Sequence, residues 1–514
     1  MNNIHVGVEG VHKLLCDLDP HKAPGPDAIP ARTLKLAAEE LAPVLTLIFQ
    51  KSLDTGEIPL LWRQANITPI FKKGDRTLPA NYRPVSLTSI CSKILEHIIH
   101  SQIMRHLNNH AVLTENQHGF RRNHSCESQL ILTVQDLARS LDKKMQIDMA
   151  IMDFSKAFDV VPHKRLISKL RTYGIHNSAL TWISNFLCCR LQRVVVSGEK
   201  SGWSKVISGV PQGTVLGPLL FFLYINDLPC GVTSSVRLFA DDCILYREIK
   251  SPHDHVALQK DLDALNDWAN RWQMKFNIGK CSIMRISHAR TSKVYTYTLG
   301  GEVLSVVEQH PYLGITISDR LNWNSHIQSI CGKANRALGF VRRNLHACRR
   351  STKLEAYRSL VRPLLEYSSS VWDPHTKLNI DRLEAVQRRG ARFIFNDYTS
   401  NTPGCVTDML TTVGLAPLEV RRKIRRLTIF KQSITGHLTL PIGNLLQPVQ
   451  RQSRHHHSES YSLIFANKDC YKFSFVPRTI RDWNALPYSA VSIPGIDGFK
   501  TAVTKHLGVS MKLD

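Results

Sequence analysis

Hydrophobic residues in the middle of the chain follow two different spacings. Helical spacing is clearest at Leu258, Leu262, Leu265, Trp268 and Trp272, where apolar side chains return every three or four residues. Short apolar runs bounded by polar or turn residues are typical of β-strands. Such runs occupy residues 66–71, 146–152, 193–196, 236–239, 244–246, 282–286 and 313–317. Residues 61–320 are therefore predicted to form a mixed region of class α+β or α/β.

The flanking regions have a different character. Residues 1–60 are predicted to be mainly helical after a turn at 23–27, which reads Ala-Pro-Gly-Pro-Asp. Residues 321–400 show helical spacing throughout, whereas residues 401–514 contain more turns and a weaker periodicity. The patterns divide the chain into four regions, with 61–320 as the mixed one.

The chain is strongly basic. Its 514 residues include 66 Lys and Arg against 42 Asp and Glu, a net charge of +24 with a pI near 9.7. Residues 321–514 hold 29 of these cations against 13 acidic residues, which is two thirds of the net charge. Such an excess indicates a polyanionic partner, first nucleic acid and second an anionic membrane surface. The densest basic clusters are Arg342-Arg343, Arg349-Arg350, Arg388-Arg389 and residues 421–426. Each of them could also be a solvated helix face.

The sequence gives no indication of export or of a membrane span. The longest apolar runs, of which 219–225 is typical, are far shorter than the roughly 18–20 residues that a spanning helix needs. Residues 1–10 lack the basic and apolar pattern of a signal peptide. The twelve cysteines are scattered without a Cys-x-x-Cys pair, so a reduced intracellular compartment is expected.

Two acidic segments carry candidate chemistry. Asp153 follows a strand-like run, and a carboxylate at a strand end is held by a rigid element. Asp241 and Asp242 lie between two strand-like runs, which predicts a hairpin with both carboxylates at its tip. Adjacent carboxylates repel, so the site needs a cation, and magnesium prefers such oxygen ligands. Three carboxylates could hold two ions about 3.5–4 Å apart for phosphoryl transfer. The alternative is a pair of solvated turn aspartates.

Seven short motifs occur in a characteristic order. They are His21–Asp27, Asn81–Leu87, Gln117–Arg121, Asp153–Asp159, Gly209–Gly213, Phe239–Asp242 and Tyr312–Gly314. In this order and spacing they resemble the reverse transcriptase of non-long-terminal-repeat (LINE-like) retrotransposons, most of all the jockey and CR1-like elements. Residues 477–484 resemble the family's C-terminal region. A single motif is weakly specific, whereas seven in order are highly specific.

The resemblance implies a right-hand polymerase of class α+β, with fingers, a palm built on an antiparallel sheet, and a helical thumb. Residues 1–60 would be an N-terminal finger extension, 61–320 the fingers and palm, 321–400 the thumb and 401–514 a basic C-terminal region. One departure is Ala28, which stands where the family often has glycine. If the turn there needs a positive φ, this alanine is strained.

The resemblance also implies RNA-templated DNA synthesis from dNTPs, a phosphoryl transfer that depends on positioning and charge stabilisation. Asp153, Asp241 and Asp242 match the family's catalytic carboxylates. The backbone carbonyl of Phe154 would be a further ligand for two Mg²⁺ ions, with Mn²⁺ as a substitute. Lys280 matches a lysine that protonates the leaving pyrophosphate, although by itself it would be a surface lysine.

Further matched residues would hold the incoming nucleotide. Phe158 matches a steric gate, whose ring leaves no room for a 2′ hydroxyl, and Gln212 would touch the nucleotide. Arg83 would grip the triphosphate, because its planar fork suits phosphate oxygens, and Lys72 or Lys73 would assist. Without the resemblance, Phe158 would be a core side chain and Arg83 a salt-bridge partner.

Glycines and a hairpin complete the expected site. Gly209 and Gly213 would let the backbone approach the substrate closely. The hairpin at Tyr312, Leu313 and Gly314 resembles the element that grips the primer end.

The expected partners are an RNA template, a DNA primer or target DNA, and dNTPs, without a membrane. Endonuclease activity would come from a missing domain or another protein, since no nuclease motif is visible. The expected location is the nucleus, after a cytoplasmic ribonucleoprotein stage. The rival hypotheses are an RNA-templated RNA polymerase, an intron maturase, and a catalytically dead or domesticated nucleic-acid-binding remnant. Phe158 opposes the first, because RNA synthesis must admit a 2′ hydroxyl.

Overall fold

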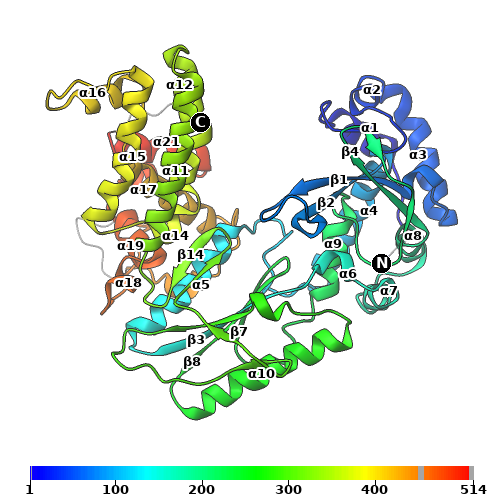
Figure 1. Cartoon of the computed structure of the whole chain (residues 1–514), viewed down its shortest axis with the longest axis horizontal. Coiled ribbons are helices and arrows are strands. Elements are labelled where there is room, and N and C mark those ends of the chain that lie inside the picture. The colour runs from blue at the N-terminus through cyan, green and yellow to red at the C-terminus, as the bar shows by residue number, and fades with distance from the viewer. Residues whose placement is uncertain (2, 450–456, 509–514) are drawn as a thin grey trace. The chain divides into compact units, whose positions relative to one another are not determined.

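The computed structural model describes residues 1, 3–449 and 457–508 (Figure 1). It contains two compact units, each assembled from three stretches of chain. The first unit comprises residues 1–120, 152–243 and 260–280, and the second comprises 121–151, 244–259 and 281–514. Both units contain helices and strands, so the predicted mixed α and β architecture is confirmed.

The first unit begins with helices and continues with alternating helices and strands. Its helices are α1 (Val8–Cys16), α2 (Ala31–Leu36), α3 (Ala38–Thr55), α4 (Ile90–Asn109), α6 (Ala157–Val160), α7 (His163–Thr172), α8 (Asn177–Leu187) and α9 (Leu216–Ile225). Its strands are β1 (Gln64–Phe71), β2 (Tyr82–Leu87), β4 (Arg190–Val196), β5 (Glu199–Lys200), β6 (Ser204–Val206) and β7 (Ser235–Phe239). Helix α1 precedes the turn at 23–27, where Ala28 has a φ of 57°, the strained value suspected from the sequence.

The second unit consists mainly of helices. They are α5 (Cys126–Asp142), α11 (Asn324–Leu345), α12 (Arg350–Ala356), a π-helical turn (Tyr357–Val361), α13 (Arg362–Glu366), α14 (Ser369–Trp372), α15 (Lys377–Phe395), α16 (Cys405–Thr412), α17 (Leu418–Ile434), α18 (Asp469–Lys472), α19 (Phe475–Asn484), α20 (Tyr488–Val491) and α21 (Ile496–His506). Its strands are β9 (Ser282–Ile286), β10 (Thr298–Leu299), β11 (Glu302–Val303), β12 (Ser305–Val306), β13 (Gln309–Tyr312) and β14 (Ile315–Ser318). Three elements cross the boundary between the units: β3 (Gln146–Asp153), β8 (Asp242–Ile249) and α10 (Pro252–Arg271).

Two sheets position the candidate site residues. In one, β1 pairs antiparallel with β2 and parallel with β4, and β4 pairs antiparallel with β6. The other has the strand order β12-β9-β3-β8-β7. Within it β3 and β9 are antiparallel as predicted, whereas the edge strand β12 is parallel to β9. Six of the seven predicted runs are strands, but the seventh begins in the turn before β14.

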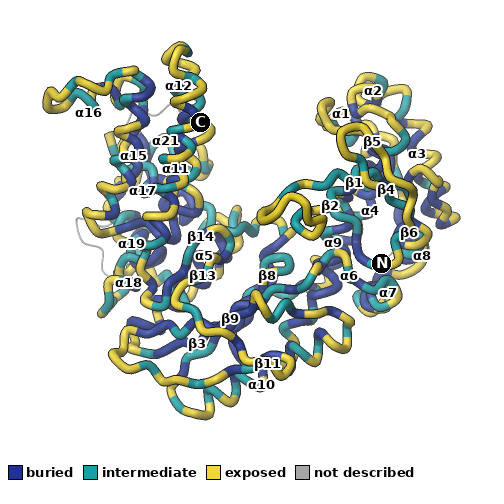
Figure 2. Tube along the Cα trace, in the orientation of Figure 1, coloured by how far each residue is buried: buried dark blue, intermediate teal, exposed yellow. Residues whose placement is uncertain are grey.

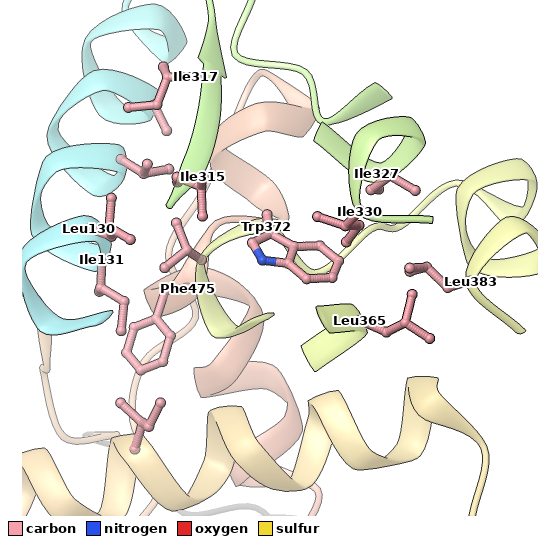
Figure 3. Packing of buried hydrophobic residues seen from close by; sticks show 14 of the residues in the cluster. Leu130, Ile131, Ile315, Ile317, Ile327, Ile330, Leu365, Trp372, Leu383 and Phe475 are labelled. Carbon is pink, nitrogen blue, oxygen red and sulfur yellow. The ribbon is translucent and has the colours of Figure 1, made fainter. Parts of the chain in front are cut away.

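One hydrophobic core extends through the second unit. Figure 3 shows Leu130 and Ile131 of α5 near Ile315 and Ile317 of β14, and Phe475 of α19 belongs to the same cluster. Buried and exposed positions alternate with helical spacing along α11 and α15 (Figure 2). None of the helices among the described residues is long and apolar enough to cross a bilayer.

Two arginines of the basic cluster at 421–426 are buried, which differs from both interpretations of the sequence, whereas Arg425 of the same cluster is exposed. Arg422 and Arg426 are 0% and 1% exposed and bind the carboxylate of Asp373, with Arg422 Nε 2.7 Å from Oδ1. Arg478 also reaches Asp373, at 3.3 Å. These arginines join α17 and α19 to α14 and do not form a surface for phosphates. The other predicted clusters, at 342–343, 349–350 and 388–389, are exposed.

Replacing Asp373 with Asn should destabilise the second unit by about 3–5 kcal/mol, because it leaves buried guanidinium groups without their countercharge. Urea unfolding monitored by tryptophan fluorescence would measure the change. Asp381→Asn, on the exposed side of α15, is the control and should shift stability by less than about 0.5 kcal/mol. Equal midpoints for the two variants would contradict the proposed role of the buried pairs.

Candidate active site

Asp153 is the last residue of β3, a strand whose other residues are all buried. The chain beyond the strand is anchored by hydrogen bonds on both sides of Phe154. Asn277 N donates to Asp153 O at 2.7 Å, and Ser155 N donates to Lys275 O at 2.8 Å. These two bonds form the bridge between Phe154 and the facing chain, so the bridge itself does not use the carbonyl oxygen of Phe154.

The ring of Phe154 reinforces this anchor. It is 3% exposed and stacks on Phe276, with ring centroids 4.4 Å apart and planes 20° apart. The stacked pair secures the backbone that carries the Asp153 carboxylate, which is a favourable arrangement for a site that needs fixed ligands.

Asp241 and Asp242 lie at the turn between β7 and β8, as the hairpin prediction requires. The two turn residues are Ala240 and Asp241, whereas Asp242 is already the first residue of β8. Ala240 has a φ of 52°, a left-handed conformation that normally favours glycine or asparagine. The sequence predicts Asp241 and Asp242 at the tip of the hairpin, whereas in the structure the turn lies one residue earlier.

The three carboxylates form one electrostatic cluster. Burial raises the pKa of Asp241, the charge of Asp153 raises it further, and Arg83 and Lys72 oppose the rise. Asp242 is an exposed residue as a whole, but protein atoms displace much of the water around its carboxylate. This desolvation, followed by repulsion from Asp241 and Asp153, raises the pKa of Asp242 to about 6.

Lys280 provides a countercharge inside this cluster. Its ammonium lies 2.7 Å from Asp153 Oδ2, and its side chain is 61% exposed. A short 3₁₀ turn, Ile278–Lys280, sets its position, with Lys280 N donating to Asn277 O at 2.8 Å. The same charge lowers the pKa of Asp242 against the effects of burial and repulsion.

The cluster has the chemistry of a divalent cation site. Among the described residues no group of three or more His, Cys, Asp and Glu side chains is already arranged to hold a metal ion. The charge of Asp153 nevertheless opposes ionisation of Asp241 and Asp242, and a hard cation relieves such repulsion. Carboxylate oxygens of this kind fit a hard divalent cation such as Mg²⁺ or Mn²⁺.

Phe158 lies on the short helix α6 and is held by other aromatic rings. It stacks on the fully buried Phe221, with centroids 4.3 Å apart and planes 24° apart. Phe120 meets it edge-on at 6.3 Å. The ring is half-buried, so one part is fixed in the core and the rest is accessible.

Gln212 is half-buried, and its Nε2 donates to Asp159 Oδ1 at 3.0 Å. The neighbouring glycines make close contacts with the protein's own backbone, a role that the sequence did not reveal. A Cβ on Gly209 would lie 2.6 Å from Asp159 O, and one on Gly213 would lie 2.6 Å from Ser86 O. Both glycines also have a positive φ.

Two cations of the β1–β2 hairpin act on the carboxylates. Arg83 lies on β2 opposite Ile70 of β1, and Lys72 follows β1 directly, with its N donating to Asn81 O at 2.9 Å. Arg83 and Lys72 are among the principal charges acting on Asp241, and Lys73 is not. All three cations are exposed.

The predicted hairpin at Tyr312 is present in the second unit between β13 and β14. Leu313 and Gly314 form its turn, with φ values of 44° and 86°. The hydroxyl of Tyr367 donates to Leu313 O at 3.0 Å, and a Cβ on Gly314 would lie 2.8 Å from the same ring. Tyr312 itself is 4% exposed, so its side chain belongs to the core.

Asp242→Asn should stabilise the metal-free protein at neutral pH. The pKa of Asp242 is raised from 3.8 to about 6 by folding, so the ionised carboxylate opposes folding above pH 6, and this effect shrinks as the pH falls toward 3.8. Because solvent screens this group, we expect the substitution to raise the free energy of unfolding by about 1 kcal/mol, which corresponds to a rise in Tm of about 2–4 °C. Thermal unfolding in EDTA at pH 7.5 and pH 5 measures this rise in Tm, which should be smaller at pH 5.

The control for this substitution is Asp267→Asn, on an exposed position of α10. It should leave Tm unchanged at both pH values. A Tm for Asp242→Asn that is lower than that of the unaltered protein at pH 7.5 would contradict the electrostatic account.

Comparisons with known proteins find similar sequences among reverse transcriptases. Residues 70–317 match the family "Reverse transcriptase (RNA-dependent DNA polymerase)". The RNA-directed DNA polymerase from mobile element jockey of Drosophila melanogaster is 30% identical over 404 residues, which cover 76% of this chain and 44% of the relative. The jockey polymerase of Drosophila funebris is 28% identical over 473 residues, which cover 88% of this chain and 51% of the relative.

A third relative is the probable RNA-directed DNA polymerase from transposon BS of Drosophila melanogaster. It is 29% identical over 414 residues, covering 76% of this chain and 44% of the relative. The chain thus spans about half the length of these relatives or somewhat less. It belongs to the reverse transcriptases of non-long-terminal-repeat retrotransposons.

Proposed function

We propose that this chain is an RNA-directed DNA polymerase that adds dNTPs to a primer 3′ hydroxyl during target-primed reverse transcription. The observation that carries the proposal is the cluster of Asp153, Asp241 and Asp242, which lies on rigid strand ends. The repulsion at Asp241 and Asp242 creates a site that favours cations, and Lys280 already acts there as a countercharge to Asp153. The family comparisons support the same activity.

In this proposal Asp153, Asp241, Asp242 and the carbonyl of Phe154 hold two Mg²⁺ ions. When bound, such ions favour deprotonation of the attacking hydroxyl and neutralise the charge of the leaving pyrophosphate. Lys280 neutralises Asp153 in the substrate-free protein. Once released from that carboxylate, its ammonium can donate a proton to the departing pyrophosphate.

The nucleotide would be held by residues that approach these carboxylates. Arg83 and Lys72 would bind the triphosphate, and we choose Lys72 over Lys73 because it acts on Asp241. Phe158 would lie under the sugar, since Phe221 and Phe120 prevent its ring from turning aside. Gln212 would contact the nucleotide, oriented by Asp159.

The right-hand layout is part of the proposal. It assigns residues 1–60 to a finger extension, 61–320 to fingers and palm, 321–400 to the thumb and 401–514 to a basic C-terminal region. The turn at Tyr312–Gly314 would contact the primer through its backbone, because Tyr312 is buried. The RNA template and DNA target would meet exposed arginines of α11 and α15.

The wider biological context is also proposed. The reaction would take place in the nucleus, following a cytoplasmic ribonucleoprotein stage. Cleavage of the target DNA would come from another part of a longer protein or from another protein.

Primer extension tests the activity. The protein should extend a DNA primer on a homopolymer RNA template with dTTP and Mg²⁺ or Mn²⁺. The double variant Asp241→Ala, Asp242→Ala should lose extension and still bind the duplex. If the unaltered protein binds the duplex in a salt-sensitive manner but never extends it, the chain is a nucleic-acid-binding remnant instead.

Phe158→Val should raise incorporation of NTPs relative to dNTPs by about 10-fold or more, because the smaller side chain leaves room for the 2′ hydroxyl. Single-nucleotide extension with dTTP and UTP measures the ratio. Phe340→Ala, at an exposed position of α11, is the control and should not change it. Unchanged discrimination in Phe158→Val would show that another group selects the sugar.

A further inference from the structure

Gln117 is a fully buried polar residue whose amide contacts the turn that carries the acidic pair. It is 0% exposed. Its Nε2 donates to Ala240 O at 3.2 Å, and its Oε1 accepts from Ala240 N at 3.0 Å. The side chain therefore satisfies both backbone groups of the residue directly before Asp241.

The conformation of Ala240 explains why such support is needed. Its φ of 52° lies in the left-handed region, which costs an L-residue other than glycine about 1–2 kcal/mol. An alanine there will return to an extended or right-handed conformation unless the surroundings hold it. The direction of the chain at Asp241 and Asp242 depends on this one residue, because it immediately precedes them.

Neighbouring backbone contacts keep Gln117 itself in place. His118 N donates to Leu238 O at 3.0 Å, and Leu238 N donates to Asn116 O at 2.8 Å, so this segment runs along β7. Gly119 N donates to Gln117 Oε1 at 2.7 Å. A Cβ on Gly119 would lie 2.5 Å from Ala240 N, so only glycine fits between the segment and the turn.

We propose that Gln117 is a positioning residue for the acidic pair: its amide holds Ala240 in the left-handed conformation and thereby directs the carboxylates of Asp241 and Asp242. Gln117 would touch no reacting atom and would act only through the turn at Ala240. The catalytic consequence rests on the polymerase function proposed above, whereas the structural part does not.

The test compares Gln117→Met with Gln387→Met. Gln387 is an equally buried glutamine of α15, whose amide donates to Ala416 O at 2.9 Å in the second unit. Amide hydrogen exchange of the peptide 236–246 should accelerate in Gln117→Met and not in Gln387→Met. This measurement requires no catalysis, so it remains decisive if the chain proves inactive. Unchanged exchange in Gln117→Met would overturn the proposal.

Primer extension provides the second measurement. Gln117→Met should lower kcat by about 10- to 100-fold, because small misplacements of catalytic groups have effects of that size. The KM for dTTP should change little, since Arg83 and Lys72, which would bind the triphosphate, belong to the separate β1–β2 hairpin. Apparent Mg²⁺ affinity should weaken with kcat. A defect confined to KM would contradict a role through the carboxylates.

Rescue separates positioning from general stability. Ala240→Gly removes the penalty for a positive φ, so adding it to Gln117→Met should restore much of the lost kcat and Mg²⁺ affinity. The same addition should not recover any loss in Gln387→Met. Failure of the rescue in Gln117→Met, or equal recovery in both backgrounds, would overturn the proposal.

If Gln117→Met does not fold, Gln117→Glu retains the test. It is nearly isosteric and keeps the oxygen that accepts from Ala240 N and Gly119 N, but it loses the donation to Ala240 O. Its rate should fall, and Ala240→Gly should again restore part of it. An unaltered rate in this variant would contradict the proposal that both hydrogen bonds between Gln117 and Ala240 are needed.

Discussion

Repulsion among three carboxylates is the constraint on which the site depends. Burial raises the pKa of Asp241 and of Asp242, the charge of Asp153 raises both further, and the charge of Asp241 adds to the rise at Asp242. A flexible chain would separate such groups. Here two strand ends and a constrained turn keep them together, so the energy of folding maintains an arrangement that only a cation can relieve.

The other polar features of the site answer this constraint. Lys280 neutralises Asp153 directly, and Arg83 and Lys72 moderate Asp241 from the β1–β2 hairpin. Stacking of Phe154 on Phe276 fixes the end of β3. These protein groups thus offset part of the repulsion among the carboxylates, and the Lys280 side chain that does so most directly is 61% exposed.

In the second unit, charged side chains of opposite sign are buried together and stabilise the packing of helices. Its arginines at 422 and 426 are buried with Asp373, so they bind helices together and do not face a partner. A high net charge therefore overstates the surface available to nucleic acid. The pairs at 342–343, 349–350 and 388–389, by contrast, are exposed to solvent.

The sequence by itself determined which residues are candidates for the chemistry, because motif order and strand-like runs are local properties. It identified Asp153, Asp241 and Asp242, six strands, the hairpin at Leu313 and Gly314, and the conformational problem at Ala28. Tertiary structure alone decided which groups support them. Gln117 lies 123 residues before Ala240, and Arg422 lies 49 residues after Asp373.

No periodicity or spacing reveals contacts across such separations, because they depend on how strands and helices meet after folding. The same reason explains why the turn consists of Ala240 and Asp241 and not of Asp241 and Asp242 as expected. Local propensity favours other turn residues, but a buried amide from a distant segment compensates the penalty for an alanine with positive φ.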